Sequence, residues 1–272
     1  SPESIQLTGT VTGPLEQPEG TLSLDARANG ELLESSASWA YRDEAVLVED
    51  GAVSVGENSA EFNGRYDIAT RSGNVALEAS FPELATVGRL ANLALEGTVA
   101  LSMDLAAGAE TVNADFNGTA ESLETPWASA ANATFSGDVQ GEWASPEGQI
   151  QVALSDARYG EATLETASLN AEGDGQDFSV EASLEGKWQD VSPLNAEMAA
   201  TVRDNATGVT LERLEGQFED YPFSIAESAR LQREDNRWSV YDFMLNIADS
   251  EIALDGNYGP EQVGIKASWE RV

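Results

Sequence analysis

The side chains with the potential for chemistry in this 272-residue chain are carboxylates, because it contains 48 Asp and Glu but no His and no Cys. This composition excludes a Ser-His-Asp triad, a thiol nucleophile and an ordinary zinc site. Neighbouring acids such as Glu49-Asp50 and Glu219-Asp220 point to opposite faces of a strand, so they do not form an acid–base pair. No pair stands out as the two convergent carboxylates of a glycosidase. We therefore expect no enzyme activity and no cofactor.

Residues 173–177, with the sequence Gly-Asp-Gly-Gln-Asp, have the residue types of a glycine-aspartate calcium turn. A calcium β-roll needs tandem copies of a nine-residue motif, and this chain has a single copy. Asp-Gly is also a typical two-residue hairpin turn. We expect a hairpin at Asp174-Gly175 and no metal site.

The composition also limits the partners of the chain. With 14 Lys and Arg its net charge is −34, so it repels phosphate backbones and anionic membrane surfaces. The acidic residues alternate with aliphatic ones instead of forming runs, which favours a folded chain. No segment is apolar enough to span a bilayer and none resembles a signal peptide. Because the sequence begins at Ser1 without Met, we expect a fragment of a longer protein.

Apolar and polar residues alternate with a period of two along most of the chain, which is typical of strands with one buried face. The clearest run spans residues 93–105, where the odd positions are aliphatic or Gly and the even positions are mostly polar. We expect the apolar face of these strands to line a groove. Its predicted lining residues are Phe62, Val75, Leu77, Phe81, Leu93, Leu95, Val99, Leu101, Met103, Ile150, Val152, Leu154, Val180, Leu184, Met198, Leu245, Ile247, Ile252, Leu254, Val263 and Ile265.

One short helix is expected near residues 82–92. Pro82 suits the first helical turn, and Leu84, Val87 and Ala91 follow at helical spacings of three and four. The other segments favour strands, so the predicted fold class is all-β, with an antiparallel meander of hairpins of variable length.

Two kinds of repeat occur. A large apolar residue, any residue and then Gly recur eight times, ending at Gly9, Gly64, Gly97, Gly118, Gly137, Gly186, Gly216 and Gly256. Such a Gly lets a sheet bend or leaves room for something lying against it. Residues 46–66 also align without gaps with residues 238–258, pairing Val48 with Val240 and Asp50 with Asp242. The irregular spacing of the glycines argues against a β-helix or a propeller.

The order of these segments resembles the TamB family of bacterial envelope proteins. Residues 66–70, the strand 73–81, the helix 82–90 and the strand 93–99 match that family's succession of strand, short helix and "L-x-G-x-L"-like strand. Later segments are similar to the middle region of the family. They are residues 164–169, 178–188, 209–216, 223–231 and 240–256. The resemblance covers essentially the whole chain through degenerate motifs of small and aliphatic residues.

The resemblance implies an elongated β-taco, in which a long sheet folds into a groove that is apolar inside and polar outside. It implies that residues 1–272 form one segment of a longer protein, without its N-terminal anchor and C-terminal domain. Family members are anchored in the inner membrane, cross the periplasm and pair with the outer-membrane barrel TamA. They are implicated in phospholipid transport between the membranes and in outer-membrane protein assembly. The expected function is therefore phospholipid transport along the groove.

Two alternatives remain open at this point. The groove edge can accept outer-membrane protein strands by β-augmentation, as a chaperone does. An extracellular structural β-solenoid or adhesin would instead have a closed, packed interior. Lipid transport uses the apolar lining, whereas the chaperone uses the backbone edge, so a charge at Leu101 should abolish the former and spare much of the latter.

Overall fold

A computed structural model describes residues 4–174, 177–203, 207–234, 237–258 and 263–271. These residues form 19 strands and one short helix, so the chain is an all-β, antiparallel meander as predicted. It divides into two compact units, residues 1–146 and residues 147–272. The prediction of a single segment stays a prediction, and each unit is described separately below.

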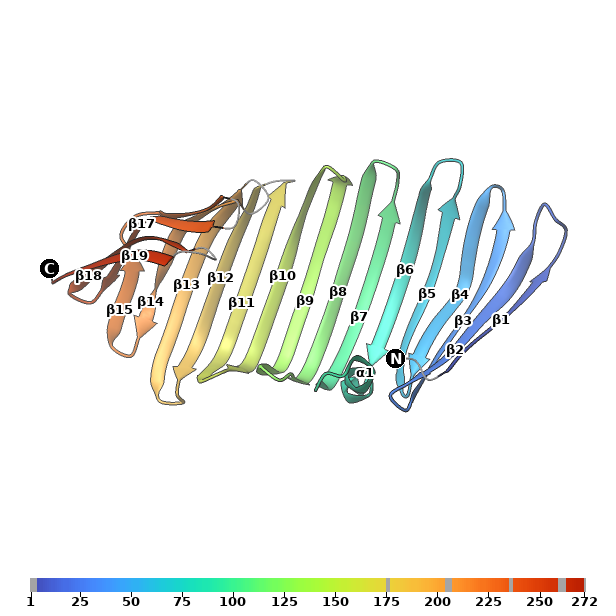
Figure 1. The fold of residues 1–272 in the computed structure, drawn as a ribbon, viewed down its shortest axis with the longest axis horizontal. Coiled ribbons are helices and arrows are strands. Elements are labelled where there is room, and N and C mark those ends of the chain that lie inside the picture. Colours follow the sequence, from blue (N-terminus) through green and yellow to red (C-terminus); the bar gives the residue numbers. More distant parts are fainter. Residues whose placement is uncertain (1–3, 175–176, 204–206, 235–236, 259–262, 272) are drawn as a thin grey trace. The chain divides into compact units, whose positions relative to one another are not determined.

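In the first unit, each strand pairs antiparallel with the next strand in the sequence, from β1 to β9 (Figure 1). The helix α1 interrupts this order between β6 and β7. The elements are β1 (Ser4–Thr12), β2 (Glu19–Ala28), β3 (Glu31–Arg42), β4 (Ala45–Val55), β5 (Asn58–Asp67), β6 (Ser72–Phe81), α1 (Leu84–Ala91), β7 (Glu96–Ala107), β8 (Thr111–Glu124) and β9 (Ala128–Glu142).

The second unit continues the meander, with one interrupted strand. Its elements are β10 (Ser145–Tyr159), β11 (Ala162–Asp174), β12 (Asp177–Trp188), β13 (Ser192–Arg203), β14 (Gly208–Phe218), β15 (Tyr221–Ile225), β16 (Ala229–Glu234), β17 (Arg237–Ile247), β18 (Ser250–Tyr258) and β19 (Val263–Arg271). Both β15 and β16 pair with β14 on one side and with β17 on the other. They therefore act as two halves of one strand, broken at residues 226–228.

Burial in both units is that of a single layer. The fully buried apolar residues in the described part are nine alanines and two valines, Val55 and Val112. A packed interior between two layers would instead bury Leu, Ile and Phe side chains completely. The large aliphatic side chains stay half-buried or exposed because no second layer covers them.

Glycines in the strands face large side chains on the neighbouring strand. Gly51 pairs with Phe62, Gly118 with Phe135, Gly173 with Phe178 and Gly216 with Phe223. A β-carbon on any of these glycines would overlap the ring of its Phe partner, with the nearest ring atom at 2.2–2.6 Å. The space left by these glycines is therefore occupied by an aromatic ring from the same sheet.

We expect Gly51→Ala to lower the free energy of unfolding by about 1–3 kcal/mol, because the new methyl group would displace the Phe62 ring. Gly208→Ala is the control, since the nearest atom to its β-carbon would be Arg203 Cβ at 4.0 Å. Urea unfolding followed by circular dichroism measures both. Equal stability of the two variants would contradict the ring–glycine contact.

The gapless repeat seen in the sequence has the same strand register in both copies. Val48 pairs with Gly64 and Gly51 with Phe62, with a bulge at residues 49–50. In the second copy Val240 pairs with Gly256 and Phe243 with Leu254, with a bulge at residues 241–242. Each bulge contains an Asp that accepts a hydrogen bond from the preceding strand, Asp50 from Ser38 (2.9 Å) and Asp242 from Arg230 (2.7 Å).

The predicted helix is confirmed as α1, and a polar network fixes its position. Asn58 is buried and donates to the carbonyls of Val55 (3.1 Å) and Glu83 (2.9 Å), and its Oδ1 accepts from the Glu83 N–H (3.0 Å). At the other end of the helix, Asn29 Nδ2 donates to the Arg89 carbonyl (3.0 Å), and Arg89 Nε lies 2.6 Å from Glu31 Oε1. The network joins α1 to the β2–β3 and β4–β5 turns.

We expect Asn58→Ala to lower the free energy of unfolding by about 1–3 kcal/mol, because it leaves the buried Val55 carbonyl and the partly buried N–H and carbonyl of Glu83 without these partners. Asn117→Ala, on an exposed site of β8, is the matched control and should change stability by less than about 0.5 kcal/mol. Thermal unfolding of the two variants compares them, and similar melting temperatures would contradict the anchoring role.

The predicted strand start at Leu93 is wrong. The helix ends at Asn92, which adopts a left-handed conformation (φ 57°), and the Leu93 N–H donates to the Gly88 carbonyl (2.8 Å). Leu95 packs on the helix where Gly88 has no side chain. β7 therefore begins at Glu96, and Leu93 and Leu95 belong to the helix connection instead of the sheet.

Candidate functional site

The apolar face of the first unit is built from rows of residues that lie opposite one another on successive strands. One row runs Val53, Ala60, Ala79, Leu101, Gly118 and Phe135 across β4 to β9. The adjacent row runs Gly51, Phe62, Leu77, Met103, Phe116 and Gly137. The first row alternates small and large residues from Ala79 to Phe135, whereas Phe62, Leu77, Met103 and Phe116 are large residues that lie opposite one another in the second row. Together the rows form a continuous but uneven apolar surface.

A hollow of about 450 Å³ opens on this face where glycines interrupt the rows. Gly64 and Gly73 lie on neighbouring strands and contribute no side chain to it. The apolar side chains around it belong to Val46, Val48, Phe62, Tyr66, Val75 and Leu105. Its size falls within the range of small-ligand sites, and its lining is predominantly apolar.

The β5–β6 turn forms one end of this hollow, because Tyr66 and Arg71 on either side of it belong to the lining. Inside the turn, Asp67 Oδ1 accepts hydrogen bonds from the backbone N–H of Thr70 (2.9 Å) and from its hydroxyl (2.9 Å). These two bonds favour the ionised carboxyl and hold the pKa of Asp67 below its usual value. The turn is thereby stabilised while Asp67 is charged.

Because its folded pKa is lowered, Asp67 stabilises the turn above its unfolded pKa, and this contribution is lost as the pH falls through the folded pKa. We expect Thr70→Val to raise the pKa of Asp67 part of the way back, since the backbone N–H remains while the hydroxyl is lost. A carboxyl ¹³C NMR titration measures the shift. Thr119→Val is the control, and an unchanged Asp67 pKa in Thr70→Val would contradict the assignment.

The second unit carries its own apolar rows. One runs Leu154, Ala167, Leu184, Ala196, Gly216, Phe223 and Ile247, so it crosses β10 to β15 and reaches β17. Another runs Val152, Leu169, Ala182, Met198 and Leu214. Leu245 lies opposite Ile252 on the last part of the unit. The predicted residues of this unit whose side chains are described therefore share one face.

The described residues include the side chains of 19 of the 21 predicted lining residues. None of the 19 is buried: sixteen are half-buried, and Val75, Leu93 and Ile150 are exposed. Apart from Leu93 and Leu95, they lie in strands. The side chains of Val263 and Ile265 lie outside the described part of the chain. The role of all these residues in lipid binding stays a prediction.

Four of the large apolar residues that line the hollow were not among the predicted lining residues: Val46, Val48, Tyr66 and Leu105. The signals were present, because three of them belong to the gapless repeat and Leu105 ends the alternating run 93–105. The hollow itself depends on which strands place their glycines side by side, and that follows from the register of β5 and β6.

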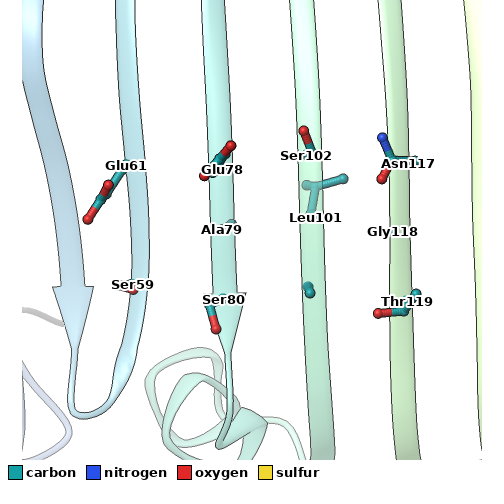
Figure 2. A pocket seen from close by; sticks show the side chains of 11 residues that line it. Ser59, Glu61, Glu78, Ala79, Ser80, Leu101, Ser102, Asn117, Gly118 and Thr119 are labelled. Atoms are coloured by element: carbon teal, nitrogen blue, oxygen red, sulfur yellow. The ribbon is translucent and has the colours of Figure 1, made fainter.

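The opposite face of the first unit is polar and acidic. Figure 2 shows Glu61, Glu78, Ser102 and Asn117 in one row across β5 to β8, where Glu61 and Glu78 are direct partners. Ser59, Ser80 and Thr119 form a second row beside it. These residues line a shallow hollow of about 420 Å³. Ala79, Ala100, Leu101 and Gly118 also line it, so its lining is mixed, whereas that of the hollow on the apolar face is predominantly apolar.

A further acidic row crosses three strands, with Asp104 opposite Asp115 and Asp115 opposite Asp138. These carboxylates do not form a metal site: within the described ranges no group of three or more acidic side chains is placed to hold a metal ion. At the predicted Asp174-Gly175 hairpin, Asp174 of β11 lies opposite Asp177 of β12. Residues 175 and 176 lie outside the described residues.

The eight-residue α1 is too short and too polar to cross a bilayer, and it is the only helix in the described part of the chain. Comparison with known proteins gives no further identification: no protein-family model matches the chain, and no curated protein matches it. The apolar faces of the two units are therefore the candidate functional surfaces.

Proposed function

We propose that the apolar face of each unit binds the acyl chains of phospholipids, and that the chain carries these lipids between the inner and outer membranes. The observation that carries the proposal is the low burial of the face: aliphatic side chains follow one another across many strands, yet none of the Leu, Ile, Met and Phe side chains in the described part of the chain is buried. Exposed apolar surfaces of this extent mark binding sites.

Acyl chains fit such a surface for a physical reason. Each methylene removed from water contributes about 0.8 kcal/mol, and binding to aliphatic side chains needs no directional contact. A lipid tail can therefore move along rows of Leu, Val, Ile and Phe without breaking a hydrogen bond, while its headgroup remains in water. In the first unit the acidic residues of β5 to β8 occupy the opposite face and leave the aliphatic rows free of carboxylates.

The choice of phospholipid, and of the bacterial envelope, rests on the resemblance of this sequence to the TamB family. The proposal accordingly places the chain in the periplasm, as part of a longer protein anchored in the inner membrane. There it pairs with an outer-membrane barrel of the TamA type and also contributes to outer-membrane protein assembly. Because no family model matches the chain, this part of the proposal rests on the resemblance of residues 66–99 and of the later strands.

Native mass spectrometry with lipid extraction tests the proposal on protein purified from bacterial cells. Leu101→Asp places a charge between Ala79 and Gly118 on the apolar face, and we expect co-purified phospholipid to fall about tenfold or more. Ala100→Asp is the matched control, because the preceding residue of β7 is exposed on the opposite face, between Ser80 and Thr119. Circular dichroism verifies that both variants fold.

Loss of lipid in both variants, or in neither, would contradict binding on the apolar face. No lipid in the unchanged protein would favour a chaperone for outer-membrane protein strands or an extracellular structural segment. Binding of unfolded outer-membrane strands would then indicate the chaperone.

A further inference from the structure

The apolar hollow of about 450 Å³ lies where the apolar rows of the first unit reach the β5–β6 turn. This turn is at the end of β5 and β6 away from α1 (Figure 1). Two rows line the hollow before the turn: Val48, Gly64, Val75 and Leu105, and then Val46, Tyr66, Gly73 and Ala107. On the other side the hollow is continuous with the row of Phe62, Leu77 and Met103. An acyl chain in the hollow can therefore continue over the rows beyond it.

The charge of the hollow is opposite to that of the chain. Asp and Glu outnumber Lys and Arg by 48 to 14, yet no carboxylate of the described residues belongs to its lining. Its two charged residues are Arg65 and Arg71. Alternation along β5 directs the Arg65 side chain to the opposite face, which Asp67 also faces. Arg71 in the turn is therefore the charge available to a ligand in the hollow.

Arg71 is free to bind such a ligand. Its side chain is exposed and forms no ion pair with any described residue. The acid of the same turn, Asp67, is held by Thr70, whose backbone N–H and hydroxyl both donate to Asp67 Oδ1. A guanidinium can donate two parallel hydrogen bonds to a phosphate. The hollow thus combines an aliphatic lining with a phosphate-binding group at one end.

We propose that this hollow holds one phospholipid in a fixed orientation, with its phosphate at Arg71 and its acyl chains on the aliphatic lining and the rows beyond. The inference rests on the proposed function and adds to it the position of the headgroup. Tyr66 is 50% exposed and suits the boundary between tail and headgroup, because its ring is apolar and its hydroxyl is polar. A lipid that moves along the apolar face would pause here until its phosphate leaves Arg71.

A comparison of two lipids with the same tails tests the phosphate contact. Native mass spectrometry of the whole chain measures the binding of dioctanoylphosphatidylglycerol and of dioctanoylglycerol, which lacks the phosphate. We expect Arg71→Gln to weaken binding of the phospholipid about threefold, as for an exposed ion pair, and to leave binding of dioctanoylglycerol unchanged. Arg27→Gln is the control, because it removes the same charge from an exposed site on β2 outside the hollow.

Photo-cross-linking tests the orientation. One phosphatidylglycerol probe carries a diazirine beside an acyl carbonyl, and a second carries it at the end of the acyl chain. The first probe should label residues 64–75, and the second should label residues outside this range. Arg71→Gln should reduce the labelling of residues 64–75 by the first probe.

The outcomes separate this site from the proposed function. If the unchanged protein binds neither lipid, both the proposed function and the site are overturned. If it binds both lipids but Arg71→Gln and Arg27→Gln have equal effects, the phosphate contact alone is overturned. Equal labelling of residues 64–75 by the two probes would contradict the fixed orientation. Competition by inorganic phosphate at the same concentration as the phospholipid would indicate an anion site without a lipid and would also overturn the proposal.

Discussion

Backbone hydrogen bonds between strands adjacent in the sequence hold both units together, because neither has a packed interior of large side chains. Each strand from β2 to β8 pairs with the strand before it and the strand after it, over nearly its full length. The side chains pack within the spacing that these backbone hydrogen bonds set. Phe rings lie over glycines of the next strand, and alanines supply most of the fully buried positions. The large aliphatic side chains thus remain available for a ligand.

The sequence predicted the strands and the apolar face well, because both follow from a period of two. Leu77 and Met103 became direct partners as the alternation requires. The two copies of the gapless repeat also have the same strand pairing. In each copy the bulge adds one residue, so the residues facing the apolar side shift from even positions at Val48 to odd positions at Gly51. Alternation failed at Leu93 and Leu95, where apolar residues contact a helix instead of continuing a strand.

The hollow on the apolar face was not predictable from the sequence. It requires Gly64 and Gly73 to lie on adjacent strands near the same turn, and that register depends on the length and hydrogen bonding of the turn. A sequence pattern fixes which face a residue occupies, but not which residue of the next strand lies beside it. For the same reason the sequence does not show that Asp104, Asp115 and Asp138 form a row across three strands.

Because each strand depends mainly on its two neighbours, the number of hairpins sets the length of the sheet. A further hairpin inserted between two existing strands would lengthen the sheet by about 10 Å and leave the distant strands unchanged. The two copies of the bulged hairpin, residues 46–66 and 238–258, are consistent with growth by duplication of such modules. The span of a protein built this way would then be set by gene length in small steps, with no redesign of a shared core.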